Sequence, residues 1–160
     1  MDIRESLKGQ YHAALAMLRE CVAKCPEDLW LAGTHPRNTW RIAYHATYFT
    51  HLYLGTDQKS FVKWKKGKVR TADLWGKPPI APPFTRDEIL EYIDLVVSLV
   101  DSSLDAMDLS ANPCGFSYYP TLPKLDHQIL NIRHLGGHVG QLSELLMARG
   151  IYVTWVTEKS

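Results

Sequence analysis

The sequence predicts an all-α protein, a four-helix bundle with a long crossover connection between its second and third helices. Four segments space their apolar residues three and four positions apart, as one face of a helix requires. Outside a short stretch at 151–156, no segment alternates apolar and polar residues as a half-buried strand does. The connection over residues 56–84 is far longer than a turn between neighbouring antiparallel helices. A chain of 160 residues can bury one core, so we expect residues 1–160 to form a single domain.

The first two predicted helices cover residues 2–24 and 38–55. The apolar stripe of the first consists of Ile3, Leu7, Tyr11, Ala14, Leu18 and Val22. The second begins after Pro36 with Asn38 or Thr39 as its N-cap, and it ends at a glycine. Residues 26–37, between the two, are expected to form a loop.

The third predicted helix opens with a capping box, in which Thr85 is followed three residues later by Glu88. Its apolar stripe consists of Ile89, Ile93, Val96, Val100, Leu104 and Met107. The fourth helix begins near Pro123 and ends at Gly150, residues suited to the start and the end of a helix. Residues 108–123 form the loop between these two helices.

The long crossover divides into two kinds of sequence. Residues 60–66 are expected to form one short helix, whereas the proline-rich residues 77–83 must be extended. Near the C-terminus, residues 151–156 are a candidate short strand.

Composition excludes several classes of protein. The formal net charge of +1 gives no overall attraction to nucleic acid, and no apolar run approaches the roughly 20 residues of a membrane span. The first residues mix both charges and do not resemble a signal peptide. Cys21, Cys25 and Cys114 are odd in number, which argues against a disulfide framework. We therefore expect a cytoplasmic protein that binds neither nucleic acid nor membrane, with Cys21 and Cys25 in its core.

The most informative feature is a pair of histidines in the fourth helix. His134 and His138 lie four residues apart, so their rings share one face and can converge on a metal ion. Gln141 lies on the next turn of the same stripe, among apolar residues, so we expect all three to point into the bundle. The alternative is that each histidine only hydrogen-bonds a backbone carbonyl or a tyrosine hydroxyl.

A third metal ligand is expected from the facing second helix. His45 shares its face with aliphatic residues and points inward, whereas His51 lies on another face. His127 shares the stripe of His134, but seven residues of axial rise separate the two. His45 is therefore the candidate.

Small residues occupy the side of the fourth helix roughly opposite the histidines. Gly136, Gly140 and Ser143 form this strip, which allows another helix to approach closely. The partner is expected within the bundle, with a homodimer as the alternative.

Together these residues resemble the DinB-like superfamily, which includes YfiT and the thiol-S-transferase-type bundles. The resemblance rests on His134-x3-His138-x2-Gln141, on Gly140 before the glutamine, and on Trp40 and His45 upstream. It implies a four-helix bundle that binds a divalent ion, often zinc or nickel. Carried over to this chain, the ligands are His45, His134 and His138.

The resemblance implies a metal-dependent enzyme acting on a small molecule. Thiol S-transfer, with a low-molecular-weight thiol as co-substrate, or hydrolysis is the expected reaction, and Gln141 would orient a ligand or water. The alternatives are a non-catalytic metal- or small-ligand-binding stress-response module, and a scaffold whose histidines are only core residues.

The crossover is also rich in basic and aromatic residues. Trp64 and Trp75 lie among Lys59, Lys63, Lys65, Lys66, Lys68, Arg70 and Lys77. This composition is found in single-strand binders, but a solvated loop is the expected interpretation. A lid that attracts an anionic substrate, with Tyr118 and Tyr119 at its mouth, is a third interpretation.

Overall fold

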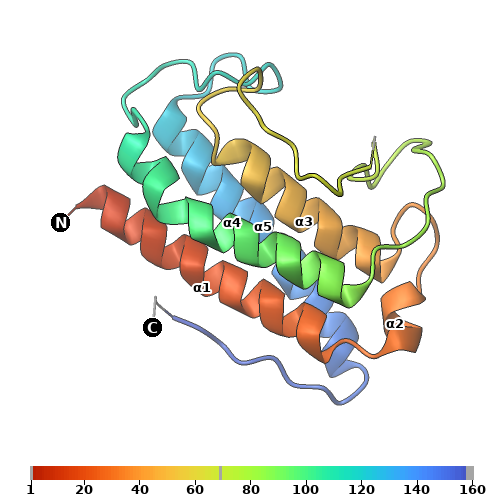
Figure 1. Ribbon diagram of the computed structural model, residues 1–160. Helices are drawn as coiled ribbons and strands as arrows, with labels where there is room; N and C mark the ends of the chain where they lie inside the picture. The colour runs from red at the N-terminus through yellow and green to blue at the C-terminus, as the bar shows by residue number, and fades with distance from the viewer. Residues whose placement is uncertain (1, 69, 158–160) are drawn as a thin grey trace.

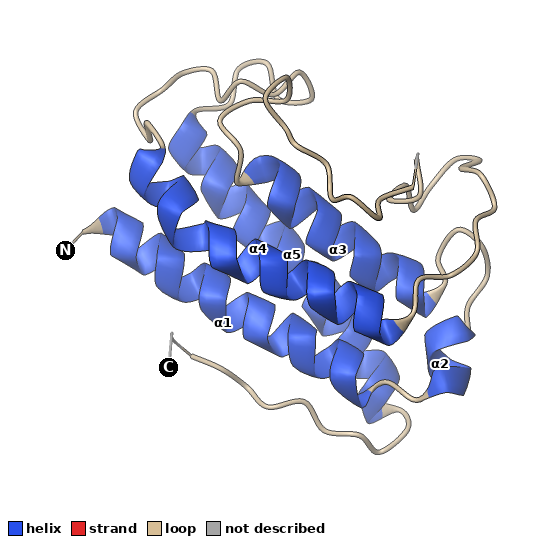
Figure 2. Cartoon of the chain, viewed as in Figure 1, coloured by secondary structure: helices blue, strands red, loops and turns tan. Residues whose placement is uncertain are grey.

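Four long helices lie side by side in the computed structural model, which describes residues 2–68 and 70–157 (Figure 1). They are α1 (Ile3–Lys24), α3 (Thr39–Tyr53), α4 (Arg86–Ala106) and α5 (Lys124–Met147). Helices α1 and α3 each pack against both α4 and α5. The described residues contain helices and loops but no strand (Figure 2), so the prediction of an all-α protein is confirmed. None of the helices in these residues is both long enough and apolar enough to cross a membrane.

The predicted apolar stripes of α1 and α4 form much of the core. Ile89, Ile93 and Val96 of α4 are fully buried, as are Tyr11 and Leu18 of α1. The predicted capping box is present, because the Thr85 hydroxyl accepts from the Glu88 N–H and the Glu88 carboxylate accepts from the Thr85 N–H. Burial of these stripes holds the helices together, since each buried aliphatic side chain contributes about 1.5–3 kcal/mol.

A small set of polar side chains crosses the core between the helices. The Tyr11 hydroxyl donates to Gln128 Oε1 over 2.7 Å, and the Gln128 amide donates to the Tyr53 carbonyl over 2.8 Å. The Asn131 amide donates to the Thr50 carbonyl over 3.2 Å. Gln128 and Asn131 are both fully buried, so these contacts satisfy the Gln128 amide and the Asn131 N–H group, while Asn131 Oδ1 has no partner among the described residues.

Three short predicted elements differ from the structure. The expected loop 26–37 contains a helix, α2 (Glu27–Leu31), which places the Trp30 indole in the core as a donor to the Phe84 carbonyl over 2.8 Å. Residues 60–66 form turns and coil rather than a helix, because Trp64 is drawn inward to stack on Tyr92 with ring centroids 4.4 Å apart. Residues 151–156 pair with no strand among the described residues; they run beside α1 and bond to its side chains.

The segment between α3 and α4 is attached to α3 by a buried arginine. The Arg41 side chain is fully buried, and its guanidinium donates to the Thr71 and Pro79 carbonyls over 3.1 Å each. No carboxylate pairs with it in the part of the chain that the structure describes. Arg41 therefore holds residues 71–79 against the helix through two charged hydrogen bonds.

The glycines of α5 do not make the close helix contact expected of them. A Cβ atom added at Gly136 or Gly140 would meet no other atom within 4 Å. Both glycines, with Ser143, line an open groove of about 410 Å³ beside α1 and the C-terminal segment. The expected close intramolecular packing is therefore absent at Gly136 and Gly140, whereas Ser143 Oγ lies 3.5 Å from Cys21 Sγ of α1.

Candidate metal centre

Three histidines from two helices converge on one point. His45 Nε2 lies 2.9 Å from His134 Nε2, and His138 Nε2 lies 3.1 Å from the same atom. One ring nitrogen from each of the three lies within 4.8 Å of the others. The histidines that the sequence predicted as ligands are therefore close enough to bind a metal ion.

Helix geometry and helix packing bring the three rings together. His134 and His138 lie one turn apart on α5, so their rings project from the same face. His45 lies on α3, which packs against α5. A pair from one helix and a single residue from its neighbour thus form the triad.

Hydrogen bonds at Nδ1 set the orientation of two of the rings. His45 Nδ1 lies 2.6 Å from the Ala72 carbonyl, and His138 Nδ1 lies 2.9 Å from Gln141 Oε1. Both partners are oxygen acceptors, so each Nδ1 carries the proton and each Nε2 presents a lone pair. This is the tautomer that a metal-binding histidine needs.

His134 cannot donate a hydrogen bond to the Nε2 lone pairs of both His45 and His138. His134 Nε2 faces the Nε2 atoms of both other histidines and can carry at most one proton. Its buried Nδ1 has no partner among the described residues. A cation among the three Nε2 atoms would satisfy all three, and tetrahedral zinc with Zn–N bonds of about 2.0–2.1 Å places ligand nitrogens about 3.3 Å apart. The residues present therefore fit a divalent ion.

The electrostatic surroundings keep the three imidazoles neutral. Burial lowers the pKa of His45 to about 3 and that of His134 to about 4. Burial also lowers the pKa of His138, which the hydrogen bond to Gln141 partly opposes. Neutral imidazoles are the metal-binding form, so the ligands need not lose a proton near neutral pH.

The centre lies at the edge of the helices rather than deep inside them. His45 is fully buried, but His134 and His138 are half-buried and Gln141 is exposed. The prediction that the whole stripe points inward is therefore wrong. The face of α5 that packs into the core is a different one, which carries Asn131, Leu135, Leu142 and Leu146.

Aromatic rings enclose the centre on the α3 side. The Phe49 ring lies 4.6 Å from His45 and 5.7 Å from His134, measured between ring centroids. The exposed Trp75, from the segment between α3 and α4, lies 5.6 Å from His45. No carboxylate or thiol joins the three histidines in the described part of the chain. Three nitrogen ligands leave at least one coordination position for water or substrate, as catalytic sites do.

Several of these surroundings escaped prediction from the sequence. The Ala72 carbonyl is a backbone group of a loop whose path no pattern reveals. Trp75 is an aromatic residue without a distinguishing spacing, whereas helical periodicity places Phe49 on the same face as His45, one turn away.

The remaining histidines lie apart from the centre, as expected for His51 and His127. His51 Nδ1 lies 3.0 Å from the Tyr92 hydroxyl. His127 is fully buried beside Phe116, Tyr53 and Tyr119, and neither of its ring nitrogens has a partner among the described residues.

His127 is expected to make the fold sensitive to acid. Burial, and then the Lys124 charge, lower its pKa from 6.5 to about 4. Between these values the unfolded state binds more protons, so the free energy of unfolding falls as the pH drops from 6.5 towards 4. The full effect is roughly 3 kcal/mol. Urea unfolding of wild type and His127→Phe at about pH 7 and about pH 4 should show a smaller acid loss in the variant; equal losses would contradict this role.

Comparison with known proteins gave no match to this chain among family models, curated proteins or solved structures.

Proposed function

We propose that this protein is a metal-dependent enzyme acting on a small molecule, with a divalent ion held by His45, His134 and His138. The observation that carries the proposal is the convergence of three Nε2 atoms, two of them in a fixed tautomer with the lone pair inward. A site made only to stabilise the fold would be closed by a fourth ligand, and the described residues supply none.

Neutral imidazole binds zinc, nickel, iron and copper alike, and the resemblance to the DinB-like superfamily favours zinc or nickel. When bound, such an ion lowers the pKa of a bound water to about 7 or holds a thiol as its thiolate. The chain supplies orientation: the Ala72 carbonyl holds the His45 ring, and Gln141 holds the His138 ring. Phe49 and Trp75 limit access of bulk water on the side of α3.

The resemblance to the DinB-like superfamily supports thiol S-transfer with a low-molecular-weight thiol, or hydrolysis, as the reaction. It also supports a four-helix bundle of α1, α3, α4 and α5, in which the segment between α3 and α4 is the crossover. We place the protein in the cytoplasm, because its three cysteines are free and buried, as expected of a reducing compartment.

A non-catalytic metal- or small-ligand-binding module is the second candidate. One observation favours it: no carboxylate lies among the three histidines in the described residues, so the centre lacks an adjacent general base. In an enzyme, the metal-bound water or thiolate would have to act without that base.

An activity assay separates the two candidates. Protein loaded with zinc or nickel is assayed for transfer of glutathione or coenzyme A to chlorodinitrobenzene, and for hydrolysis of p-nitrophenyl acetate. We expect wild type to turn over substrate faster than the uncatalysed reaction. His134→Ala should keep its fold but lose at least about a hundredfold in turnover rate. A wild type that binds one ion per chain but turns over neither substrate would favour the binding module.

A further inference from the structure

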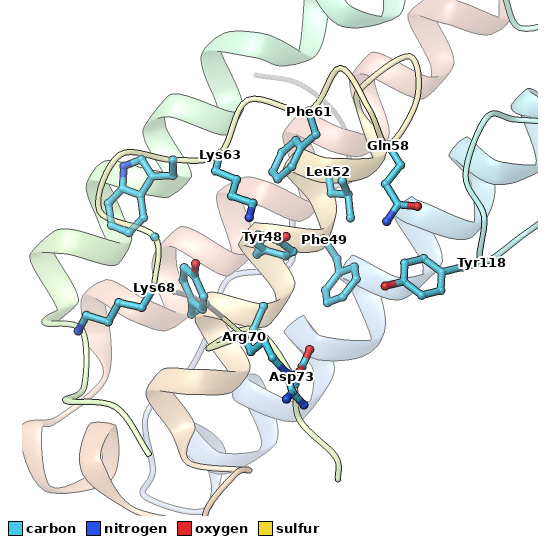
Figure 3. A pocket seen from close by; sticks show the side chains of 14 residues that line it. Tyr48, Phe49, Leu52, Gln58, Phe61, Lys63, Lys68, Arg70, Asp73 and Tyr118 are labelled. Atoms are coloured by element: carbon cyan, nitrogen blue, oxygen red, sulfur yellow. Dashed lines mark hydrogen bonds and ion pairs between the residues drawn. The ribbon is translucent and has the colours of Figure 1, made fainter. Parts of the chain in front are cut away.

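A cavity of about 430 Å³ lies between α3 and the segment that joins it to α4 (Figure 3). Five aromatic side chains from these two elements line it: Tyr44, Tyr48, Phe49, Phe61 and Trp64. Cavities of this size and character bind small organic molecules, and flat aromatic walls favour a flat aromatic body.

Hydrogen-bond donors from four side chains face this cavity. Lys63 extends from the crossover towards Tyr48, and the Tyr118 hydroxyl points towards Phe49 from the opposite side (Figure 3). The Lys63 ammonium and the hydroxyls of Tyr48 and Tyr118 have no hydrogen-bond partner among the described residues. Gln58 uses its Oε1 to accept from Ser117 over 2.7 Å, which leaves its amide N–H groups free.

The other charged groups of the lining are already paired. Arg70 Nε lies 3.3 Å from Asp73 Oδ2, so the acidic side chain of the lining is matched by an arginine. Lys68 donates to the Pro82 carbonyl over 2.9 Å. Among the residues that the structure describes, the lining therefore carries three basic residues against one acidic residue, and Lys63 is its free cation. The excess of positive charge in the lining, with Lys63 not paired to a carboxylate, favours an anionic group.

The cavity adjoins the candidate metal centre through shared residues. Phe49 lines the cavity and packs against the His45 and His134 rings. Ala72 also lines the cavity, and its carbonyl accepts the His45 hydrogen bond. Because Phe49 and Ala72 contact both the cavity and the His45 ring, a molecule in the cavity would lie beside the centre.

We infer that this cavity is the substrate site and that it binds a small aromatic acid. The carboxylate is held by Lys63 and Tyr48, and the aromatic body lies along Phe49 and Phe61. Of the residues that the sequence suggested for a lid, Lys63, Lys68, Arg70 and Tyr118 line the cavity, whereas Tyr119 packs against Tyr53 and His127 instead. The assignment of substrate class rests on the proposed function; the binding of the acid does not.

Naphthoate is the probe that tests this inference, with uncharged naphthamide beside it. Each is titrated by calorimetry into protein treated with a chelator, so that the result is independent of any ion. We expect saturable binding of one naphthoate per chain, and binding of naphthamide weaker by about tenfold, because a charged hydrogen bond is lost.

Two lysine variants test whether naphthoate binds in the cavity. Lys63→Gln should weaken naphthoate binding by about tenfold, whereas Lys77→Gln, an exposed lysine of the same crossover outside the cavity, should leave it within about twofold. Equal effects of the two variants, or no saturable binding by wild type, would overturn the inference. Failure of the metal or activity assays bears on the proposed function alone, because this titration is made without an ion.

Discussion

Replacing His45 with alanine is expected to lower the zinc affinity of the protein by more than about a hundredfold. Loss of a residue that only orients a ligand lowers metal affinity by about 10–100-fold, and His45 would itself be a ligand. His138→Ala should behave in the same way, since its Nε2 lies 3.1 Å from that of His134. Competition for zinc with a chromophoric chelator measures the affinity, and mass spectrometry of the purified protein measures the ion content.

His51→Ala is the matched control on the same helix. Its ring contacts the Tyr92 hydroxyl and stays out of the centre, so this variant should bind zinc as wild type does. If His45→Ala and His51→Ala retain zinc equally, the three histidines are core residues and not a metal centre.

Replacing Arg41 with leucine is expected to weaken both the fold and the metal centre. The change leaves the Thr71 and Pro79 carbonyls without their donors, at a cost of about 3 kcal/mol in the free energy of unfolding. It also loosens the segment whose Ala72 carbonyl holds the His45 ring, so zinc affinity should fall by about tenfold or more. Urea unfolding and zinc competition measure the two effects.

Arg19→Leu provides the comparison for Arg41. Arg19 of α1 forms a half-exposed ion pair with Asp94 of α4, and such pairs contribute less than about 1 kcal/mol. This variant should keep wild-type zinc affinity. If folded Arg41→Leu also kept the zinc affinity of wild type, Arg41 would support the fold without positioning His45.

Local periodicity explains why the helices and the histidine pair were predictable. The stripe from Ile89 to Leu104 and the capping box at Thr85 act within a few residues, and the structure contains both. The spacing of His134 and His138 likewise determines that their rings share a face. His45 was found because it lies on an aliphatic face of its helix, where an imidazole needs a partner.

Contacts between distant segments explain what the sequence could not reveal. The carbonyl that holds His45 belongs to a residue 27 positions away, and nothing in the local pattern predicts that meeting. The helical conformation expected at residues 60–66 is lost to stacking of Trp64 on Tyr92, a tertiary contact that overrides local preference. The exposure of Gln141 depends on which face of α5 meets the other helices.

The polar contacts that cross the core fix the alignment of α3 and α5, the two helices that carry the metal ligands. Gln128 and Asn131 of α5 are tied to the carbonyls of Tyr53 and Thr50 on α3, and apolar side chains alone would tolerate sliding far better. A slip of one helical turn, about 5.4 Å, would break both ties and carry His134 away from His45. Two side-chain amides that lie outside the centre thus determine how the two helices align. This alignment in turn brings the three rings together.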